Sequence, residues 1–384
     1  MHKPVILVLT SLIAATGFAA PAPDAGWPAY GGDAGGARYS SLTQITPANV
    51  GELRIAWIFR TGELGQGVKD WHRSAFESTP VLHDGTLYLT TSSTDVVAVD
   101  AASGLLRWRH HSQSRKDLHY SDGVSRGVSI WIDATTAPAS ACHVRIFAPT
   151  LDGRLLALDA SNGHSCADFG EHGAINLLRD VRSQFKEGDE WRDYLVTSPP
   201  AILGDRVIVG SSIGDNRAVV EELGIVRAFD ARSGALLWSW DPIPRDPANP
   251  VYREWKPDKV GNASAANAWA PLSVDATRQL VFVPTGSASP DFFGGERPGD
   301  NRWANSIVAL DGNTGALVWG QQLVHHDLRI TTSAHNQRLP VSCTTASRWP
   351  PSSRRPRPDF FSPLTARPAS PSFLSSSARC RRMR

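Results

Sequence analysis

A short hairpin pattern that occurs four times constrains the fold of this chain more than any other feature. Each copy has an apolar, β-branched run that ends on an aspartate, a glycine four residues later, and a second apolar run. Such a pattern predicts a β-hairpin, because Asp can bond the turn backbone and Gly takes positive φ without steric cost. The aspartates are Asp100, Asp159, Asp230 and Asp311, and the glycines are Gly104, Gly163, Gly234 and Gly315.

Tryptophan strengthens the repeat. Three copies end on a tryptophan eight residues after the aspartate (Trp108, Trp238 and Trp319), whereas the second copy reaches Cys166 without one. Fixed internal spacing is typical of a repeat architecture, and the alternative is four unrelated hairpins. Successive copies lie further apart than the about 40–50 residues of an ordinary propeller blade. We therefore expect an all-β chain of blades with long insertions, which in such folds build the binding face.

The N-terminus is typical of an exported protein. Lys3 precedes an apolar run from Val5 to Ala15, and small residues follow. This order predicts a signal peptide over residues 1–20, with an uncleaved anchor as the alternative. No later segment reaches the roughly 18 uncharged apolar residues of a membrane span. We expect a periplasmic or otherwise exported protein with no transmembrane span beyond the signal segment.

The four cysteines fit an oxidising compartment better than a metal site. Cys142 and Cys166 flank the repeat that lacks the tryptophan, and we expect them to form a disulfide after export. Cys343 and Cys380 lie in an unusual C-terminal stretch. No CxxC spacing is present, which argues against a zinc site made of these residues.

The composition changes abruptly at Arg329. Residues 329–384 hold eleven Arg and one acidic residue, Asp359, and contain no Gly, Lys or Glu. We interpret this stretch as a disordered tail translated out of frame, so that the propeller is truncated. The alternatives are a genuine Arg/Ser/Pro tail and a basic segment that binds nucleic acid. We expect no nucleic-acid partner.

Nine motifs, in order, make residues 27–328 resemble the quinoprotein dehydrogenases, which use pyrroloquinoline quinone (PQQ). The motifs are GGDAGGARYSSL, ITPANVGELRIAW, FESTPVL, SRGVSIW, TSPPAIL, VGSSIGDN, NAWAP, PTGSASPDFFGG and VHHDL. The resemblance is greatest to the membrane-type glucose dehydrogenase branch, which includes quinate and polyol dehydrogenases and has a matching cysteine pair. It implies an eight-bladed propeller, of which residues 21–328 would form about four blades.

The resemblance also implies a cofactor site. PQQ is a flat tricarboxylate, which needs cations and hydroxyls for its carboxylates and an aromatic floor. Trp269 in NAWAP matches the floor, and Arg126 in SRGVS matches a carboxylate-binding arginine, whose planar fork suits that group. Thr197, Ser212 and Glu77 match further polar contacts. Taken singly, each residue has a structural explanation: blade packing for the tryptophan, a salt bridge for the arginine, backbone contacts for the hydroxyls.

The metal site and the catalytic base depart from the family pattern to different degrees. Asp215 and Asn216 match ligands for Ca²⁺, which prefers several hard oxygens, although an isolated Asp-Asn pair is also typical of a turn. A third ligand, Asn in the alcohol dehydrogenases, falls near Ser287. The family motif HHDLWD ends on the catalytic aspartate, but here that position is Ile330, and Asp327 is the nearest acid. The lysine expected further on is absent.

These observations predict an exported PQQ- and Ca²⁺-dependent dehydrogenase that oxidises a sugar or polyol, with a quinone or cytochrome as electron acceptor. The chain as written is expected to be inactive, because it lacks the base. Two other classes compete with this interpretation. One is a non-catalytic propeller scaffold, like the blade proteins of outer-membrane assembly. The other is a tryptophan-rich sugar-binding protein.

Overall fold

The described residues all belong to the first of two compact units, Met1–Leu339 and Pro340–Arg384. The structure, a computed structural model, describes residues 26–63, 74–121, 123–181, 191–214, 216, 222–255 and 265–329. The predicted signal peptide, Asp215, Ile330, Cys343 and Cys380 therefore lie outside the described residues, as does all of the predicted tail except Arg329.

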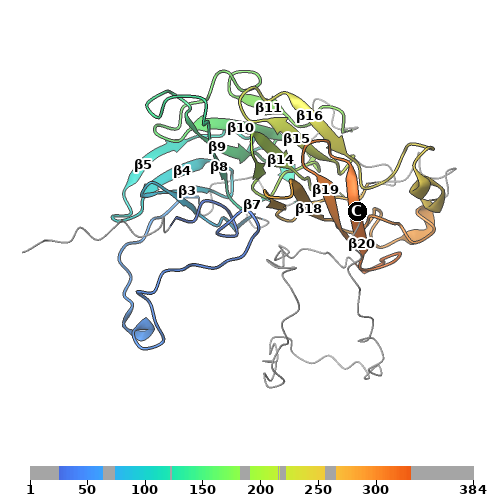
Figure 1. The fold of residues 1–384 in the computed structure, drawn as a ribbon, viewed down its shortest axis with the longest axis horizontal. Helices are drawn as coiled ribbons and strands as arrows, with labels where there is room; N and C mark the ends of the chain where they lie inside the picture. The colour runs from blue at the N-terminus through green and yellow to red at the C-terminus, as the bar shows by residue number, and fades with distance from the viewer. Residues whose placement is uncertain are drawn as a thin grey trace, which may run out of the picture. The chain divides into compact units, whose positions relative to one another are not determined.

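Four four-stranded antiparallel sheets follow one another along the chain, as the sequence predicts (Figure 1). Sheet 1 has β2 (Val81–His83), β3 (Thr86–Thr90), β4 (Val96–Asp100) and β5 (Leu106–His110), and sheet 2 has β8 (Ser129–Ile132), β9 (Val144–Pro149), β10 (Arg154–Asp159) and β11 (Ala174–Asn176). Sheet 3 has β13 (Ala201–Leu203), β14 (Arg206–Val209), β15 (Val226–Asp230) and β16 (Leu236–Trp240), and sheet 4 has β17 (Ser273–Asp275), β18 (Leu280–Pro284), β19 (Ser306–Asp311) and β20 (Leu317–Gln322). Each sheet is one predicted blade.

The sheets pack face to face because their strands are apolar on both sides. In β9, Ile146 belongs to the core shared with sheet 1, whereas the next residue, Phe147, belongs to the core shared with sheet 3. In β14, Val207 likewise faces sheet 2 and Ile208 faces sheet 4. Successive side chains of a strand point to opposite faces, so a sheet with neighbours on both faces is built from nearly continuous apolar runs.

The repeat forms the hairpin between the third and fourth strand of sheets 1, 3 and 4. Its aspartate accepts a hydrogen bond from the backbone of the turn, as in the 2.9 Å contact from Thr314 N to Asp311 Oδ1. The hydroxyl of Thr314 bonds the same oxygen, and these bonds lower the pKa of Asp311. The glycine has positive φ in all four copies, for example 72° at Gly315. The predicted turn chemistry is confirmed.

A tryptophan joins neighbouring sheets and explains why the glycine is needed. Trp238 of sheet 3 donates its indole N–H to the carbonyl of Gly312 in sheet 4 over 3.0 Å. A Cβ on Gly315 would lie only 2.6 Å from the Trp238 ring. Trp108 of sheet 1 has the same relation to Gly163 of sheet 2. The tryptophan of one sheet thus packs against the Asp-to-Gly turn of the next sheet.

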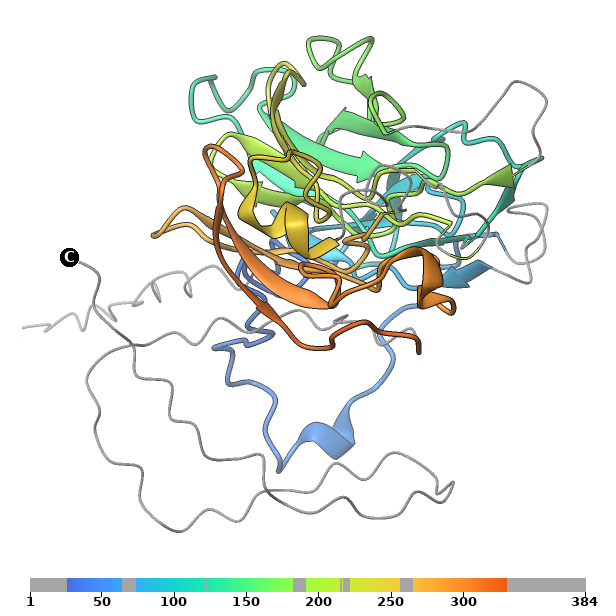
Figure 2. The same ribbon diagram turned by 90° about the vertical axis from the view of Figure 1, so that its right-hand side faces the viewer.

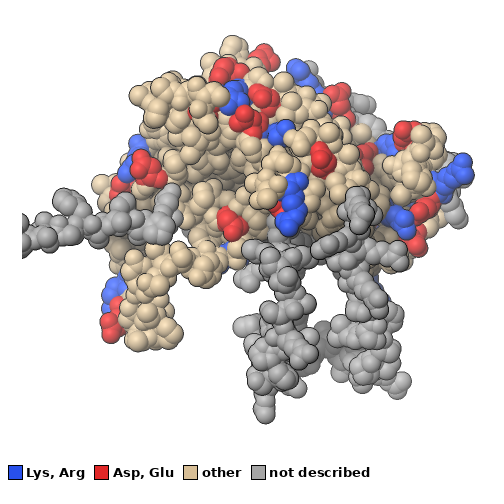
Figure 3. Space-filling view, viewed as in Figure 1, with Lys and Arg blue, Asp and Glu red and all other residues tan. Residues whose placement is uncertain are grey.

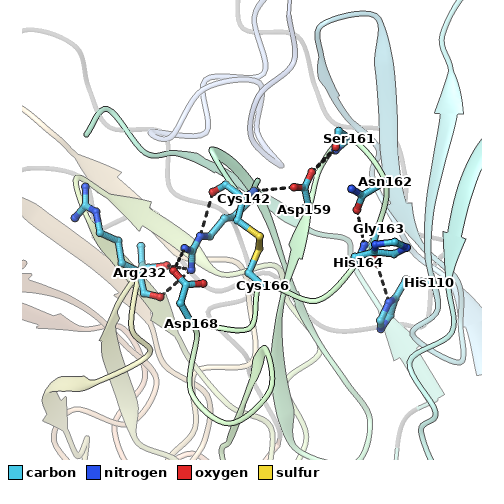
Figure 4. The surroundings of a disulfide bond; sticks show 12 residues. His110, Cys142, Asp159, Ser161, Asn162, Gly163, His164, Cys166, Asp168 and Arg232 are labelled. Carbon is cyan, nitrogen blue, oxygen red and sulfur yellow. Dashed lines mark hydrogen bonds and ion pairs between the residues drawn. A yellow bond between two sulfur atoms is a disulfide. The ribbon is translucent and has the colours of Figure 1, made fainter. Parts of the chain in front are cut away.

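The second copy of the repeat, which lacks the tryptophan, ends at a disulfide-bonded cysteine. Cys142 and Cys166 are bonded, with their Cα atoms 5.8 Å apart, and Cys142 N donates to Asp159 Oδ2 over 2.7 Å (Figure 4). The predicted pairing is confirmed. At the junction with sheet 3, Gly234 meets Ile175 instead of an indole. A cavity of about 750 Å³ lies beside this junction.

The segment from Leu53 to Arg60 is extended but is not a strand. The sequence RIAWIF predicts a strand, but the segment has no strand partner among the described residues. A strand requires a hydrogen-bonded neighbour, and this segment packs on sheet 1 through side chains only, with Trp57 and Phe59 against Leu89 and Val97. The indole N–H of Trp57 donates to the carbonyl of Ala101 over 3.2 Å. Trp57 therefore contacts the turn of sheet 1 in the same way as Trp238 contacts the turn of sheet 4.

The remaining elements are short. Two parallel pairs are β1 (Ser74–Phe76) with β7 (Gly123–Ser125) and β6 (His119–Tyr120) with β12 (Trp191–Arg192), and the 3₁₀ helices are η1 (Val50–Glu52), η3 (Pro250–Trp255) and η4 (Gly294–Glu296). Helix η1 stands away from the sheets at the end of a long loop (Figures 1 and 2). Among the described residues no helix has the length and apolarity that a membrane crossing requires. Acidic and basic groups are interspersed on the described surface that Figure 3 shows.

Apolar side chains at the two ends of the sheet series lead to a first prediction. Ile55 is 80% exposed and Ile58 is 62% exposed near sheet 1, and Val318 is 54% exposed on sheet 4. Clustered exposed apolar groups bind hydrophobic dyes. We expect the purified protein to raise the fluorescence of ANS in native buffer, and Ile55→Ser with Ile58→Ser to lower that signal. A dye-negative wild-type protein would show that these side chains are covered in solution.

Candidate functional site

Four of the residues that the sequence predicts for cofactor binding meet around Arg126. Its Nη2 lies 2.8 Å from Glu77 Oε2, and its Nη1 donates to Thr197 Oγ1 over 2.7 Å. The guanidinium carbon stands 4.8 Å from the centre of the Trp269 ring. A carboxylate, a hydroxyl and an aromatic face therefore surround one cation. We refer to Glu77, Arg126, Thr197 and Trp269 as the Arg126 cluster.

The topology explains how residues so far apart in sequence come together. Each member of the Arg126 cluster lies three or four residues before the first strand of a different sheet, namely β2, β8, β13 and β17. The first strands of consecutive blades run side by side, so the N-terminal ends of these strands lie on the same face of the propeller. The local signal is a polar or aromatic residue followed within two positions by Ser, Thr, Gly or Pro, and then a strand. That signal is visible in FESTPVL, SRGVSIW, TSPPAIL and NAWAPL.

Backbone contacts fix the Arg126 cluster further. The N–H of Arg126 donates to the carbonyl of Thr197 over 2.8 Å, and the N–H of Thr79 donates to the carbonyl of Arg126 over 3.1 Å. Ser198 Oγ donates to the carbonyl of Trp269 over 2.6 Å. These bonds tie sheets 1 to 2, 2 to 3 and 3 to 4 at the site. The site is therefore a product of blade packing.

Burial makes the arginine a pre-oriented anion receptor. The Arg126 side chain is only 16% exposed, and Glu77 beside it is 40% exposed. Thr197 is buried. A partly desolvated guanidinium held on two sides loses little side-chain entropy when it binds a ligand, and it bonds carboxylates more strongly than neutral acceptors. The cluster can therefore bind a flat, aromatic molecule that carries carboxylate groups.

Ser212 and Asn216 lie on the neighbouring loop. Ser212 is buried and exchanges two backbone hydrogen bonds with Leu195, of 2.8 and 2.9 Å, which places it beside the segment that carries Thr197. Asn216 is exposed, and Asp215 lies outside the described residues. Within the described ranges, no three His, Cys, Asp or Glu residues gather as metal ligands would. The fit of this loop to a calcium ion thus depends on Asp215.

Asp193, an acidic residue near this loop, was not predicted from the sequence. Asp193 accepts a hydrogen bond from Ser121 Oγ over 2.9 Å, and a Cβ built on Gly214 would lie 2.7 Å from the Asp193 side chain. No local pattern distinguishes Asp193, because its contact is made only when β6 and β12 pair. Its position places a carboxylate next to the predicted metal loop.

Asp327 is a buried anchor. Ser287 Oγ donates to Asp327 Oδ2 over 2.6 Å, and Asn305 Nδ2 donates to the same oxygen over 3.1 Å. The guanidinium of Arg297 donates to the Asp327 carbonyl. Asp327 is 4% exposed. The nearest acid to the predicted base position is thus bonded to Ser287, the position predicted near the third metal ligand.

A cavity of about 750 Å³ has none of the predicted site residues in its lining. This cavity is lined by residues of sheets 1, 2 and 3, and none belongs to the Arg126 cluster. A second cavity of about 240 Å³ contacts Pro271 and Leu272, just beyond Trp269. We assign the site to the Arg126 cluster, because a carboxylate, a hydroxyl and an aromatic ring all contact one partly buried guanidinium there.

This chain is similar to proteins that are named as quinoprotein or quinone-dependent dehydrogenases. A family model described as "PQQ: Glucose/ethanol/alcohol dehydrogenase, beta-propeller domain" matches residues 27–329. The quinoprotein glucose dehydrogenase of Escherichia coli (strain K12) is 38% identical over 314 residues, which cover 80% of this chain and 38% of that protein. The quinate/shikimate dehydrogenase (quinone) of Acinetobacter baylyi is 36% identical over 319 residues, which cover 79% of this chain and 38% of that protein.

The fold has solved counterparts as well. The crystal structure of quinohemoprotein alcohol dehydrogenase from Comamonas testosteroni superposes with a TM-score of 0.65 at 28% identity, covering 81% of this chain and 43% of that one. The chain therefore spans about two-fifths of the length of the relatives that it matches.

Proposed function

This chain belongs to the family of PQQ-dependent glucose, ethanol and alcohol dehydrogenases, and from that premise we propose that the Arg126 cluster binds PQQ for the oxidation of a sugar or polyol. The observation that carries the proposal is the convergence of Glu77, Arg126, Thr197 and Trp269 from the segments that lead into four different sheets. A cation, a hydroxyl and an aromatic face are the groups that a flat tricarboxylate requires.

The proposal divides three tasks among the residues of the Arg126 cluster. Arg126 bonds a carboxylate of the cofactor, while Glu77 and Thr197 hold the guanidinium in place. The indole of Trp269 provides a flat apolar surface for the ring system. When bound, PQQ supplies the acceptor for the hydride that leaves the alcohol carbon of the substrate. A dehydrogenase of this type also needs a base for the hydroxyl proton.

The substrate, the electron acceptor, the calcium ion and export are proposed from the relatives and from the sequence. Relatives named for glucose and for quinate or shikimate point to a polyhydroxylated substrate and a quinone acceptor, with a cytochrome as the alternative acceptor. Asp215 and Asn216 would provide oxygen ligands for Ca²⁺, whose charge polarises a carbonyl. Residues 1–20 would direct export.

Cofactor binding tests the proposal directly. We expect PQQ to quench the intrinsic tryptophan fluorescence of the protein in a saturable titration, because Trp269 lies at the site. Arg126→Met should raise the Kd for PQQ about 10- to 100-fold, since a hydrogen bond to a charged group contributes about 1.5–3 kcal/mol. The measurement is a fluorescence titration of each variant with PQQ in the presence of Ca²⁺.

A matched arginine provides the control. Arg278 pairs with Asp275 over 2.6 Å in the turn between β17 and β18, away from the Arg126 cluster. Arg278→Met should leave the Kd for PQQ unchanged. If the wild-type protein shows no saturable quenching, the scaffold or sugar-binding interpretations gain support. In that case glucose titration distinguishes the two.

A further inference from the structure

Thr90, at the end of β3, contacts both segments that carry the charged members of the Arg126 cluster. Its side chain is fully buried, and its Oγ1 lies 2.7 Å from Ser125 Oγ and 3.3 Å from Ser78 Oγ. The backbone N–H of Thr90 donates to the same Ser78 oxygen over 3.1 Å. Ser78 directly follows Glu77, and Ser125 directly precedes Arg126. Three buried hydroxyls thus form one continuous chain behind the site.

The two segments need this support because their own pairing is short. β1 and β7 share only three residue pairs, the last of which sets Phe76 opposite Ser125. Short strands at the margin of a fold open locally at low cost. Thr90, in contrast, lies in the four-stranded sheet 1, whose core continues into sheet 2. Its hydroxyl therefore connects a weak pair of strands to a stable sheet.

The position of Arg126 follows from that connection. Its guanidinium contacts Glu77, Thr197 and Trp269 at the distances given above, so a small shift of the backbone changes all three contacts. Without the Thr90 hydroxyl, Ser78 and Ser125 would lose a buried partner, and leaving buried polar groups unpaired is costly. The two serines would move to recover hydrogen bonds, and the residues next to them would move as well.

We propose that Thr90 is a positioning residue whose hydroxyl sets the separation of Glu77 and Arg126 and so holds Arg126 ready for a carboxylate of the cofactor. The inference rests on the proposed function for the identity of that ligand. The arrangement itself is a property of the described contacts and can be tested without the cofactor.

The test compares variants of one strand. Thr90→Val keeps the shape of the side chain and removes the hydroxyl, whereas Thr90→Ser keeps the hydroxyl. Thr86→Val removes a buried hydroxyl from the other end of β3, where Thr86 Oγ1 accepts a 2.7 Å hydrogen bond from Arg107. We expect Thr90→Val to raise the Kd for PQQ about ten-fold or more, and Thr90→Ser and Thr86→Val to stay within about three-fold of wild type.

Two results would overturn the inference. If Thr90→Val binds PQQ as tightly as Thr86→Val, the hydroxyl does not position Arg126. If Thr90→Ser is as weak as Thr90→Val, the methyl packing matters and the hydroxyl does not. Should Thr90→Val fail to fold, Ser125→Ala removes the other end of the 2.7 Å contact and is expected to raise the Kd in the same way.

A double-mutant cycle separates this inference from the proposed function. If wild-type protein binds no PQQ, the proposed function is wrong, and the cycle between Thr90→Val and Arg126→Met decides the inference. Arg126→Met should lower the unfolding free energy less in the Thr90→Val background than in wild type, because the contacts of Arg126 are already displaced there. Equal losses in both backgrounds would mean that the two residues act independently.

Discussion

Replacing Trp238 by alanine is expected to lower the free energy of unfolding by about 3–5 kcal/mol, the usual cost of removing a large buried aromatic side chain. Trp238 is buried in the core between sheets 3 and 4, and its indole N–H bonds the carbonyl of Gly312. The substitution leaves a cavity at the sheet junction and a carbonyl without its donor. Urea unfolding followed by far-UV circular dichroism measures the change.

The repeat offers a matched control for this substitution. Trp319 occupies the same position of the hairpin pattern in sheet 4, but it is 45% exposed, and its ring partner is Phe282, with the ring centres 5.9 Å apart. Trp319→Ala should therefore cost less than about 1 kcal/mol, as exposed positions usually do. A loss as large as that of Trp238→Ala would mean that Trp319 is packed in solution against a surface that the described residues do not include.

The hairpins could be predicted from sequence because every interaction that defines them is local. Asp311, Thr314 and Gly315 lie within five residues, and their hydrogen bonds and φ values depend on almost nothing else. The number of sheets followed from counting these hairpins. The packing function of the glycine was not predictable in the same way, because the indole that covers Gly315 comes from the preceding sheet.

The error at residues 54–59 has a clear physical cause. Alternating apolar residues predict a strand, yet a strand exists only when another chain segment satisfies its backbone, and no local pattern reveals whether one is available. Trp57 makes a contact that the sequence could not predict either. It lies outside the repeat, so its contact with Gly104 could be recognised only in three dimensions.

The candidate site also contains residues that the sequence predicts and residues that only the fold reveals. Glu77, Arg126, Thr197 and Trp269 were predicted from family resemblance, and their convergence was visible only once the first strands of four sheets lay side by side. Thr90 was missed because the sequence LYLTT presents it as one more strand residue. Residues that support a site from behind carry no motif of their own, because their partners are set by the fold.

The chain as written is expected to show no measurable oxidation of glucose or polyols, even with PQQ and Ca²⁺ supplied. General-base catalysis contributes about 10²–10⁴-fold to a rate, and Ile330, which the family resemblance predicts at the position of the base, cannot accept a proton. Asp327 is a poor substitute, because Ser287 and Asn305 already bond its carboxylate and the side chain is buried. A dye-reduction assay on the reconstituted protein measures the rate.

Two variants make this last prediction specific. Ile330→Asp alone should not restore turnover, because the sequence that follows it also departs from the family pattern and lacks the expected lysine. Our interpretation of residues 329–384 as out of frame predicts that a chain with the frame restored from codon 329 turns over substrate at least about 10²-fold faster than the chain as written, since the family motif would supply the base. Equal rates from the two chains would show that the base lies elsewhere. Asp327→Asn would then be the next variant to assay, since Asp327 is the nearest carboxylate in the described sequence.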